Sequence, residues 1–131
     1  MTTRCLECKK AGVDHDEVIR RVKKSPLEAG IILGEMTFLE TGLHRAIDKW
    51  FMKCINSGKR RFIFMMPRNH GKTMYNICIM IWRMAVDPNV RILYRMASSK
   101  NAEKSLKVVT QIMALSKNLA HFCPHFIKLV E

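Results

Sequence analysis

The chain of 131 residues carries 23 Lys and Arg against 11 Asp and Glu, a formal net charge of +12, and 48% of its residues are hydrophobic. This content supports a globular core, and the basic excess favours an anionic partner such as nucleic acid or a nucleotide phosphate. The longest apolar run, 77–82, is far shorter than the roughly 20 residues that cross a bilayer. The first residues lack an apolar signal peptide, so we expect neither a membrane protein nor a secreted one.

The first half of the chain predicts helices. Asp14 and Ser25 are each followed three residues later by a glutamate, which is typical of the start of a helix, and Pro26 suits the first helical position. A third helix is predicted between Thr41 and Ser57 because apolar side chains recur at helical spacing, at Leu43, Ala46, Ile47, Trp50, Phe51 and Cys54.

The second half alternates between apolar runs and helical patterns. Segments 60–67 and 90–97 predict strands, and 126–130 predicts the beginning of a third. Helices are predicted from Lys72 to about Val86 and from Ser98 to about Lys117. This order favours an α/β fold with a parallel sheet and right-handed crossovers, in three αβα layers.

One loop carries the chemistry, at the junction between the predicted strand 60–67 and the helix from Lys72. Helix N-termini hold phosphate through unpaired N–H groups and the helix dipole, and Gly71 lets the backbone approach the ligand closely. Lys72 can reach the β- and γ-phosphates, and Thr73 can place its hydroxyl on Mg²⁺. The candidate nucleotide-binding residues are Pro67, Arg68, Asn69, His70, Gly71, Lys72 and Thr73. The alternative is an ordinary turn with an exposed lysine.

The pattern Pro-Arg-x-x-Gly-Lys-Thr after an apolar strand resembles the variant Walker A loop of phage terminase large subunits, the ATPase motors that package viral DNA. Three segments resemble that family in the same order, 43–47 before the loop, 82–88 at the end of the loop helix, and 90–103 beyond it. The region 117–124 also fits. The resemblance covers about residues 25–128 and departs from the standard phosphate loop at Met66, where that loop begins with glycine.

The resemblance implies a role for individual residues and for partners. Lys72 and Thr73 would bind ATP and Mg²⁺, and Arg68 would act on the γ-phosphate as an arginine finger in cis. His44 matches a position where relatives contact adenine through glutamine, although a solvated helix histidine is the alternative. The family's partners are double-stranded DNA, the small terminase subunit and the portal protein, in the cytoplasm of an infected or prophage-carrying bacterium. The resemblance also allows a homo-oligomeric ring, which would require the full-length protein.

The sequence after the loop lacks the pair of carboxylates that an ATPase needs. Such enzymes use a carboxylate pair to hold magnesium and to polarise the attacking water. Residues 1–58 hold 10 basic and 8 acidic side chains, whereas 59–131 hold 13 basic and only 3 acidic ones, Asp87, Glu103 and Glu131. The Walker B pair and the nuclease are therefore expected elsewhere in a larger protein. We expect an N-terminal helical region over 1–58, the first half of a P-loop ATPase domain with an incomplete sheet over 59–131, and weak ATP binding without turnover.

Two other functions stay open. The chain could belong to another P-loop DNA translocase or helicase-like ATPase, or it could be a non-enzymatic basic DNA-binding module. The candidate DNA contacts are the cluster 20–24 and the side chains of Lys100, Lys104 and Lys107, which share a helix face, although a solvated face explains them equally well.

Cysteine usage favours a reducing compartment. The five cysteines are an odd number without an export signal, and Cys54 and Cys78 fall on apolar helix faces. Cys5 and Cys8 form one CxxC pair that His15, or Cys123 with His125, would have to complete as a zinc site. One such pair is weak evidence, so we expect free thiols and no zinc.

Overall fold

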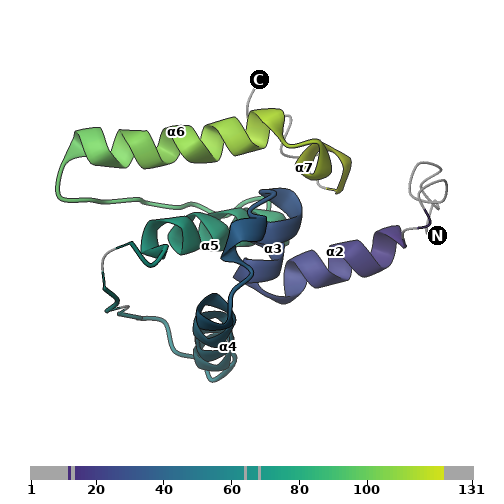
Figure 1. Ribbon diagram of the computed structural model, residues 1–131, viewed down its shortest axis with the longest axis horizontal. Coiled ribbons are helices and arrows are strands. Elements are labelled where there is room, and N and C mark those ends of the chain that lie inside the picture. Colours follow the sequence, from purple (N-terminus) through teal and green to yellow (C-terminus); the bar gives the residue numbers. More distant parts are fainter. Residues whose placement is uncertain (1–11, 13, 64, 68, 123–131) are drawn as a thin grey trace.

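The computed structural model describes residue 12 and residues 14–63, 65–67 and 69–122, and all regular structure in these residues is helical (Figure 1). The α-helices are α2 (His15–Lys24), α3 (Pro26–Leu33), α4 (Gly42–Asn56), α5 (Lys72–Val86), α6 (Ser99–Leu115) and α7 (Lys117–Phe122), with a 3₁₀ turn η1 at Thr37–Leu39. The predicted helices are confirmed, and α7 and η1 are additional.

Four helices begin where their capping residues predict. The Asp14 carboxylate accepts from the backbone N–H of Asp16 at the start of α2. The hydroxyls of Ser25, Thr41 and Ser98 accept from the N–H three residues further on, at the starts of α3, α4 and α6. Each cap satisfies a donor that the helix itself leaves unpaired, so these boundaries depend on local chemistry.

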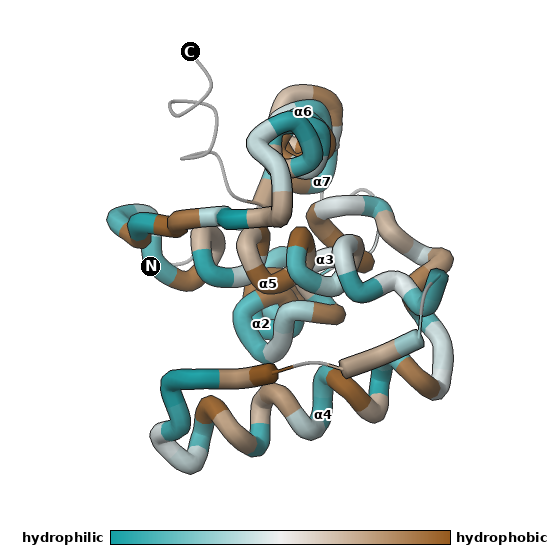
Figure 2. The backbone as a smooth tube through the Cα atoms, turned by 90° about the vertical axis from the view of Figure 1, so that its left-hand side faces the viewer, coloured by the Kyte–Doolittle hydropathy of each residue, from teal (hydrophilic) through white to brown (hydrophobic). Residues whose placement is uncertain are grey.

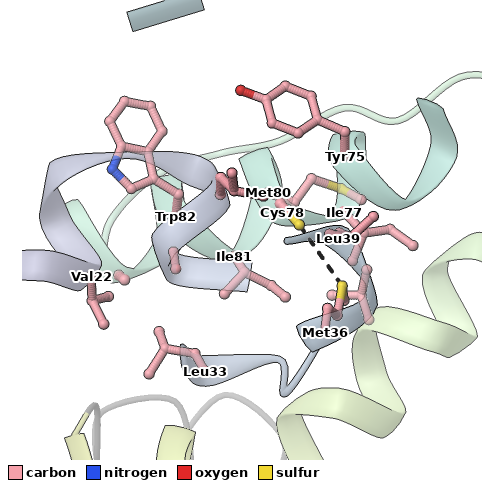
Figure 3. Close-up of a cluster of buried hydrophobic side chains, with 14 of the residues drawn as sticks. Val22, Leu33, Met36, Leu39, Tyr75, Ile77, Cys78, Met80, Ile81 and Trp82 are labelled. Atoms are coloured by element: carbon pink, nitrogen blue, oxygen red, sulfur yellow. Dashed lines mark hydrogen bonds between the residues drawn. The ribbon is translucent and has the colours of Figure 1, made fainter. Parts of the chain in front are cut away.

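Helices α3 and α5 form the centre of the molecule and pack together more extensively than any other pair. Gly30 makes this approach possible, because a Cβ there would lie 2.2 Å from the Cys78 Sγ atom. Figure 3 shows Cys78 facing Met36 across this contact, with their sulfur atoms 3.8 Å apart. Apolar side chains on most faces of α5 are typical of a buried helix. Helix α5 accordingly buries the side chains of Tyr75, Ile77, Cys78, Met80, Ile81, Trp82 and Ala85.

The other helices surround this pair. In both ribbon and tube views α6 lies on one side of α3 and α5, and α4 lies on the opposite side (Figures 1 and 2). The Trp82 indole N–H donates to the Lys23 carbonyl at 3.0 Å and connects α5 to α2. The start of α7 is held on α3, since the Ser116 hydroxyl donates to the Leu33 carbonyl and Asn118 donates to the Ile32 carbonyl.

The prediction of an αβα P-loop fold with a parallel sheet is wrong for the described residues, which contain no β-strand. The predicted strands 60–67 and 90–97 form no ladder with any part of the chain that the structure describes. Figure 2 shows the first alongside α4 and the second on the side of α6, so they are not neighbours. The predicted strand 126–130 lies outside the described residues.

Exposure shows why these apolar runs do not behave as buried strands. Ile63, Met65 and Leu93 are 81%, 89% and 85% exposed. Only part of each run is anchored: the Phe62 ring packs on Phe51 of α4, with centroids 5.1 Å apart, and Tyr94 packs against the edge of the core. An apolar run becomes a strand only where a neighbouring strand satisfies its backbone, and here the helices supply none.

The amphipathic pattern of α4 predicts its buried face incompletely. Phe51 and Cys54 are buried as expected, whereas Leu43 and Trp50 are 46% and 43% exposed. His44 takes the inner position in the first turn instead. None of the helices in the described part of the chain is long and apolar enough to span a membrane.

Candidate functional site

The loop 66–73 connects the extended segment to the first turn of α5, and Lys72 is the first residue of that helix. Arg68 lies outside the described residues, so its proposed role as an arginine finger has no structural description. Pro67, Asn69, His70 and Thr73 are exposed, and Gly71 and Lys72 are half-buried. The loop is therefore open to solvent on the side that a ligand would approach.

Two residues of the loop have the left-handed backbone conformation that is common in anion-binding turns. Asn69 has a φ of 62°, and Gly71 has φ 75° and ψ 23°, both left-handed, while Lys72 is already helical. Successive left- and right-handed residues turn neighbouring N–H groups to one side, which creates a concavity for an anion. The N-cap residue of α5 is Gly71, which has no side chain to cap the helix, in contrast to the N-cap residues of α2, α3, α4 and α6. The N-cap residue of α5 therefore leaves the first N–H groups of this helix uncapped.

The Lys72 ammonium folds back across the loop. Its Nζ atom donates to the Met66 carbonyl at 2.6 Å, so the side chain joins the two ends of the turn. A phosphate entering the loop could replace the Met66 carbonyl as the acceptor, and exchanging a carbonyl for a charged oxygen strengthens the hydrogen bond. Thr73 is exposed, which leaves its hydroxyl accessible to a hydrated metal ion.

His44 contacts the loop from α4. Its side chain is buried, at 7% exposure, which overturns the alternative of a solvated helix histidine. The Nε2 atom lies 3.0 Å from the His70 carbonyl oxygen, and Nδ1 lies 2.8 Å from the Thr41 hydroxyl. The structure thus brings His44 to the loop and directs both of its ring nitrogens to protein atoms.

Asp87 lies at the opposite end of α5 from the loop. Asp87 follows the last residue of this 15-residue helix, about 22 Å along its axis from Lys72. Glu103 belongs to α6. The described residues contain no group of three or more His, Cys, Asp and Glu side chains that could hold a metal ion.

One half-buried carboxylate has a structural role that sequence reasoning missed. Asp48 accepts through Oδ1 from the Tyr75 hydroxyl at 3.0 Å and from the Leu27 backbone N–H at 3.1 Å. It therefore joins α4 to both α5 and α3. This role could not be predicted from the position of Asp48 on the polar side of α4, because both partners come from other helices.

The zinc candidates are only partly described. Cys5, Cys8, Cys123 and His125 lie outside the described residues. The His15 ring lies against those of His121 and Phe122, with centroid separations of 5.3 and 5.0 Å. Cys54 and Cys78 are free thiols buried in the helical core, as their positions predicted.

The candidate DNA-binding cations are at the surface. Lys100, Lys104 and Lys107 are exposed along α6. In α2, Arg20 pairs with Glu17, and Arg21 pairs with Glu28 at 2.9 Å, so part of the charge in the 20–24 cluster is compensated. The α6 side chains are the stronger candidates for phosphate contacts.

No protein-family model, curated protein or solved structure matches this chain.

Proposed function

We propose that the loop 66–73 binds the triphosphate of ATP with Mg²⁺, and that the chain is the nucleotide-binding N-terminal part of a phage terminase large subunit. The observation that carries the proposal is the Lys72 ammonium, held 2.6 Å from the Met66 carbonyl across a loop that leads into a helix whose N-cap residue, Gly71, supplies no side-chain cap. The described residues form no sheet, so the fold lends this proposal no support, and it depends on the loop and its sequence.

The proposed roles follow from chemistry and from the motif. Lys72 would move from the Met66 carbonyl to the β- and γ-phosphate oxygens, the N–H groups at the start of α5 would hold the same phosphates, and Thr73 would bind Mg²⁺ through its hydroxyl. Arg68 would stabilise charge on the γ-phosphate. The resemblance supports double-stranded DNA, the small terminase subunit and the portal protein as partners in the bacterial cytoplasm.

The chain is expected to bind ATP without hydrolysing it. After residue 58 it carries only Asp87, Glu103 and Glu131 as acids, and no carboxylate pair is available to hold magnesium and orient water. Magnesium-dependent ATPase activity of the purified chain, abolished by Lys72→Ala, would contradict this part of the proposal.

Titration calorimetry with Mg-ATP tests the binding. Lys72→Ala removes a charged hydrogen bond to phosphate, and we expect affinity to fall by about 10- to 100-fold. The matched control is Lys107→Ala, which removes an exposed lysine from α6 and should leave the affinity unchanged. Equal binding by wild type and Lys72→Ala would overturn the proposal.

The second candidate is a non-enzymatic basic module that binds DNA through α6. The exposure of Lys100, Lys104 and Lys107 on one helix favours it, as does the lack of a sheet in the described residues. If ATP binding is indifferent to Lys72 but is lost with salt and with neutralisation of the α6 lysines, this candidate replaces the first.

A further inference from the structure

The first turn of α4 buries a histidine in an otherwise solvated stretch. Leu43 and Arg45, on either side of His44, are exposed, whereas His44 is only 7% exposed. Burying an imidazole is unfavourable unless its nitrogens are hydrogen-bonded. The partners of this ring therefore indicate what it is placed to do.

The hydrogen bonds of His44 define its tautomer. A carbonyl oxygen can only accept, so Nε2 donates to the His70 carbonyl at 3.0 Å. In the neutral ring Nδ1 is then the acceptor, and the Thr41 hydroxyl donates to it at 2.8 Å. The same hydroxyl accepts from the His44 backbone N–H at 3.3 Å as the cap of α4. Both ring nitrogens are thus engaged within the protein, one with the helix cap and one with the loop.

The ring also packs against the turn that precedes Lys72. A Cβ added to Gly71 would lie 2.7 Å from His44 Nε2 and 3.3 Å from Cε1. His44 consequently contacts the loop on the face where Gly71 lacks a side chain, and bonds the adjacent carbonyl. Since Gly71 has a left-handed backbone at the start of α5, this contact acts on the residues that turn the N–H groups toward a ligand.

We propose that His44 is a positioning residue of the loop 66–73, which holds the left-handed turn at Gly71 ready for phosphate instead of contacting the nucleotide base. This inference rests on the proposed phosphate-binding function and specifies how that site is preorganised. Preorganisation raises affinity because the loop loses less conformational freedom when the ligand binds.

Two probes separate loop positioning from base contact: Mg-ATP and inorganic tripolyphosphate with Mg²⁺. His44→Ala should weaken both by the same factor, about 2- to 12-fold for one neutral hydrogen bond. His44→Gln should restore both, because its amide can donate to the His70 carbonyl from a similar reach. Weakened binding of ATP with unchanged binding of tripolyphosphate would show a base contact and overturn the inference.

A matched variant shows whether a loss of stability by itself weakens ligand binding. Ser25→Ala deletes the cap of α3, a comparable helix start that lies on another helix, and should lower the free energy of unfolding without changing either affinity. If Ser25→Ala weakens both ligands as much as His44→Ala does, the role of His44 is merely structural.

Hydrogen exchange of the ligand-free protein keeps the two proposals distinguishable. His44→Ala should accelerate exchange of the amides of residues 69–73 relative to those of the α5 core, and His44→Gln should not. Unchanged exchange in His44→Ala would overturn the positioning role even if ATP binds. Wild-type protein that binds neither ATP nor tripolyphosphate, but shows the exchange effect, would overturn the proposed function and leave His44 as a residue that orders the loop.

Discussion

Asp48 and His44 lie one helical turn apart on α4, and each joins that helix to a distant part of the chain. Burial, with a contribution from the Asp48 charge, raises the pKa of the Tyr75 phenol above its ordinary value. The same two causes raise the pKa of the Cys78 thiol from 9.0 to about 12. Both groups therefore stay neutral in the folded protein under conditions in which the unfolded chain already ionises them.

This difference predicts alkaline destabilisation. The stabilising effect of Cys78 is fully present below its unfolded pKa of 9.0 and is lost as the pH rises toward about 12, because only the unfolded chain releases the proton. We expect the free energy of unfolding to fall by about 1.4 kcal/mol per pH unit for each such group. Urea titrations between pH 8 and 11 measure the slope, which Cys78→Ala should reduce. An identical slope in the variant would contradict the argument.

At the scale of elements, the α3–α5 contact determines the core. Gly30 allows α3 to approach α5 at Cys78, and the side chains beyond this contact, Leu33 and Ile81 among them, are fully buried (Figure 3). Helices that approach this closely tolerate little added volume, because a packed core yields only by shifting backbone or distorting side chains.

Gly30→Ala tests this packing. Its new Cβ would lie 2.2 Å from Cys78 Sγ, and we expect a loss of about 1–3 kcal/mol in the free energy of unfolding. Gly42→Ala is the matched control, since this glycine also lies in a helix and a Cβ there meets nothing within 4 Å; it should stabilise by about 0.5–1 kcal/mol. Cys78→Ala should reduce the cost of Gly30→Ala in a double-mutant cycle. Equal effects of the two glycine substitutions would exclude close packing at Gly30.

At the scale of the whole molecule, the described residues form a helical assembly with two extended segments on its surface. The core takes its side chains from α2, α3, η1 and α4 before residue 58 and from α5, α6 and α7 after it. Segments 59–67 and 90–97 contribute Phe62 and Tyr94 at its margin, and most of their other apolar side chains face solvent.

A pair of leucine substitutions tests where the core ends. Leu93 is 85% exposed and Leu33 is fully buried. We expect Leu93→Ala to change the free energy of unfolding by less than about 0.5 kcal/mol, and Leu33→Ala to cost about 2–5 kcal/mol. Chemical denaturation monitored by circular dichroism measures both. Comparable losses would show that segment 90–97 is buried, and the description of it as a surface segment would be wrong.

Like the fold, the candidate site has features that a local sequence pattern predicts and features that depend on residues far apart in the chain. The motif predicts phosphate binding by the loop 66–73 from residue types alone, because glycine, lysine and threonine at that spacing suit phosphate chemistry at the start of a helix. The burial of His44 was not visible in the sequence, since its partner His70 lies 26 positions further along the chain. A histidine among exposed neighbours carries no local sign of a remote carbonyl.

The sequence by itself determined the starts of α2, α3, α4 and α6, because a cap and its donor lie within three residues and compete with water alone. It also determined that α5 is central, through apolar side chains on most of its faces. Only the tertiary structure decided whether the apolar runs 60–67 and 90–97 become strands of a sheet. Backbone groups in an extended segment need partners from elsewhere in the chain. The hydrophobicity of a segment favours its burial, but whether the segment is buried depends on the helices and strands that can pack against it.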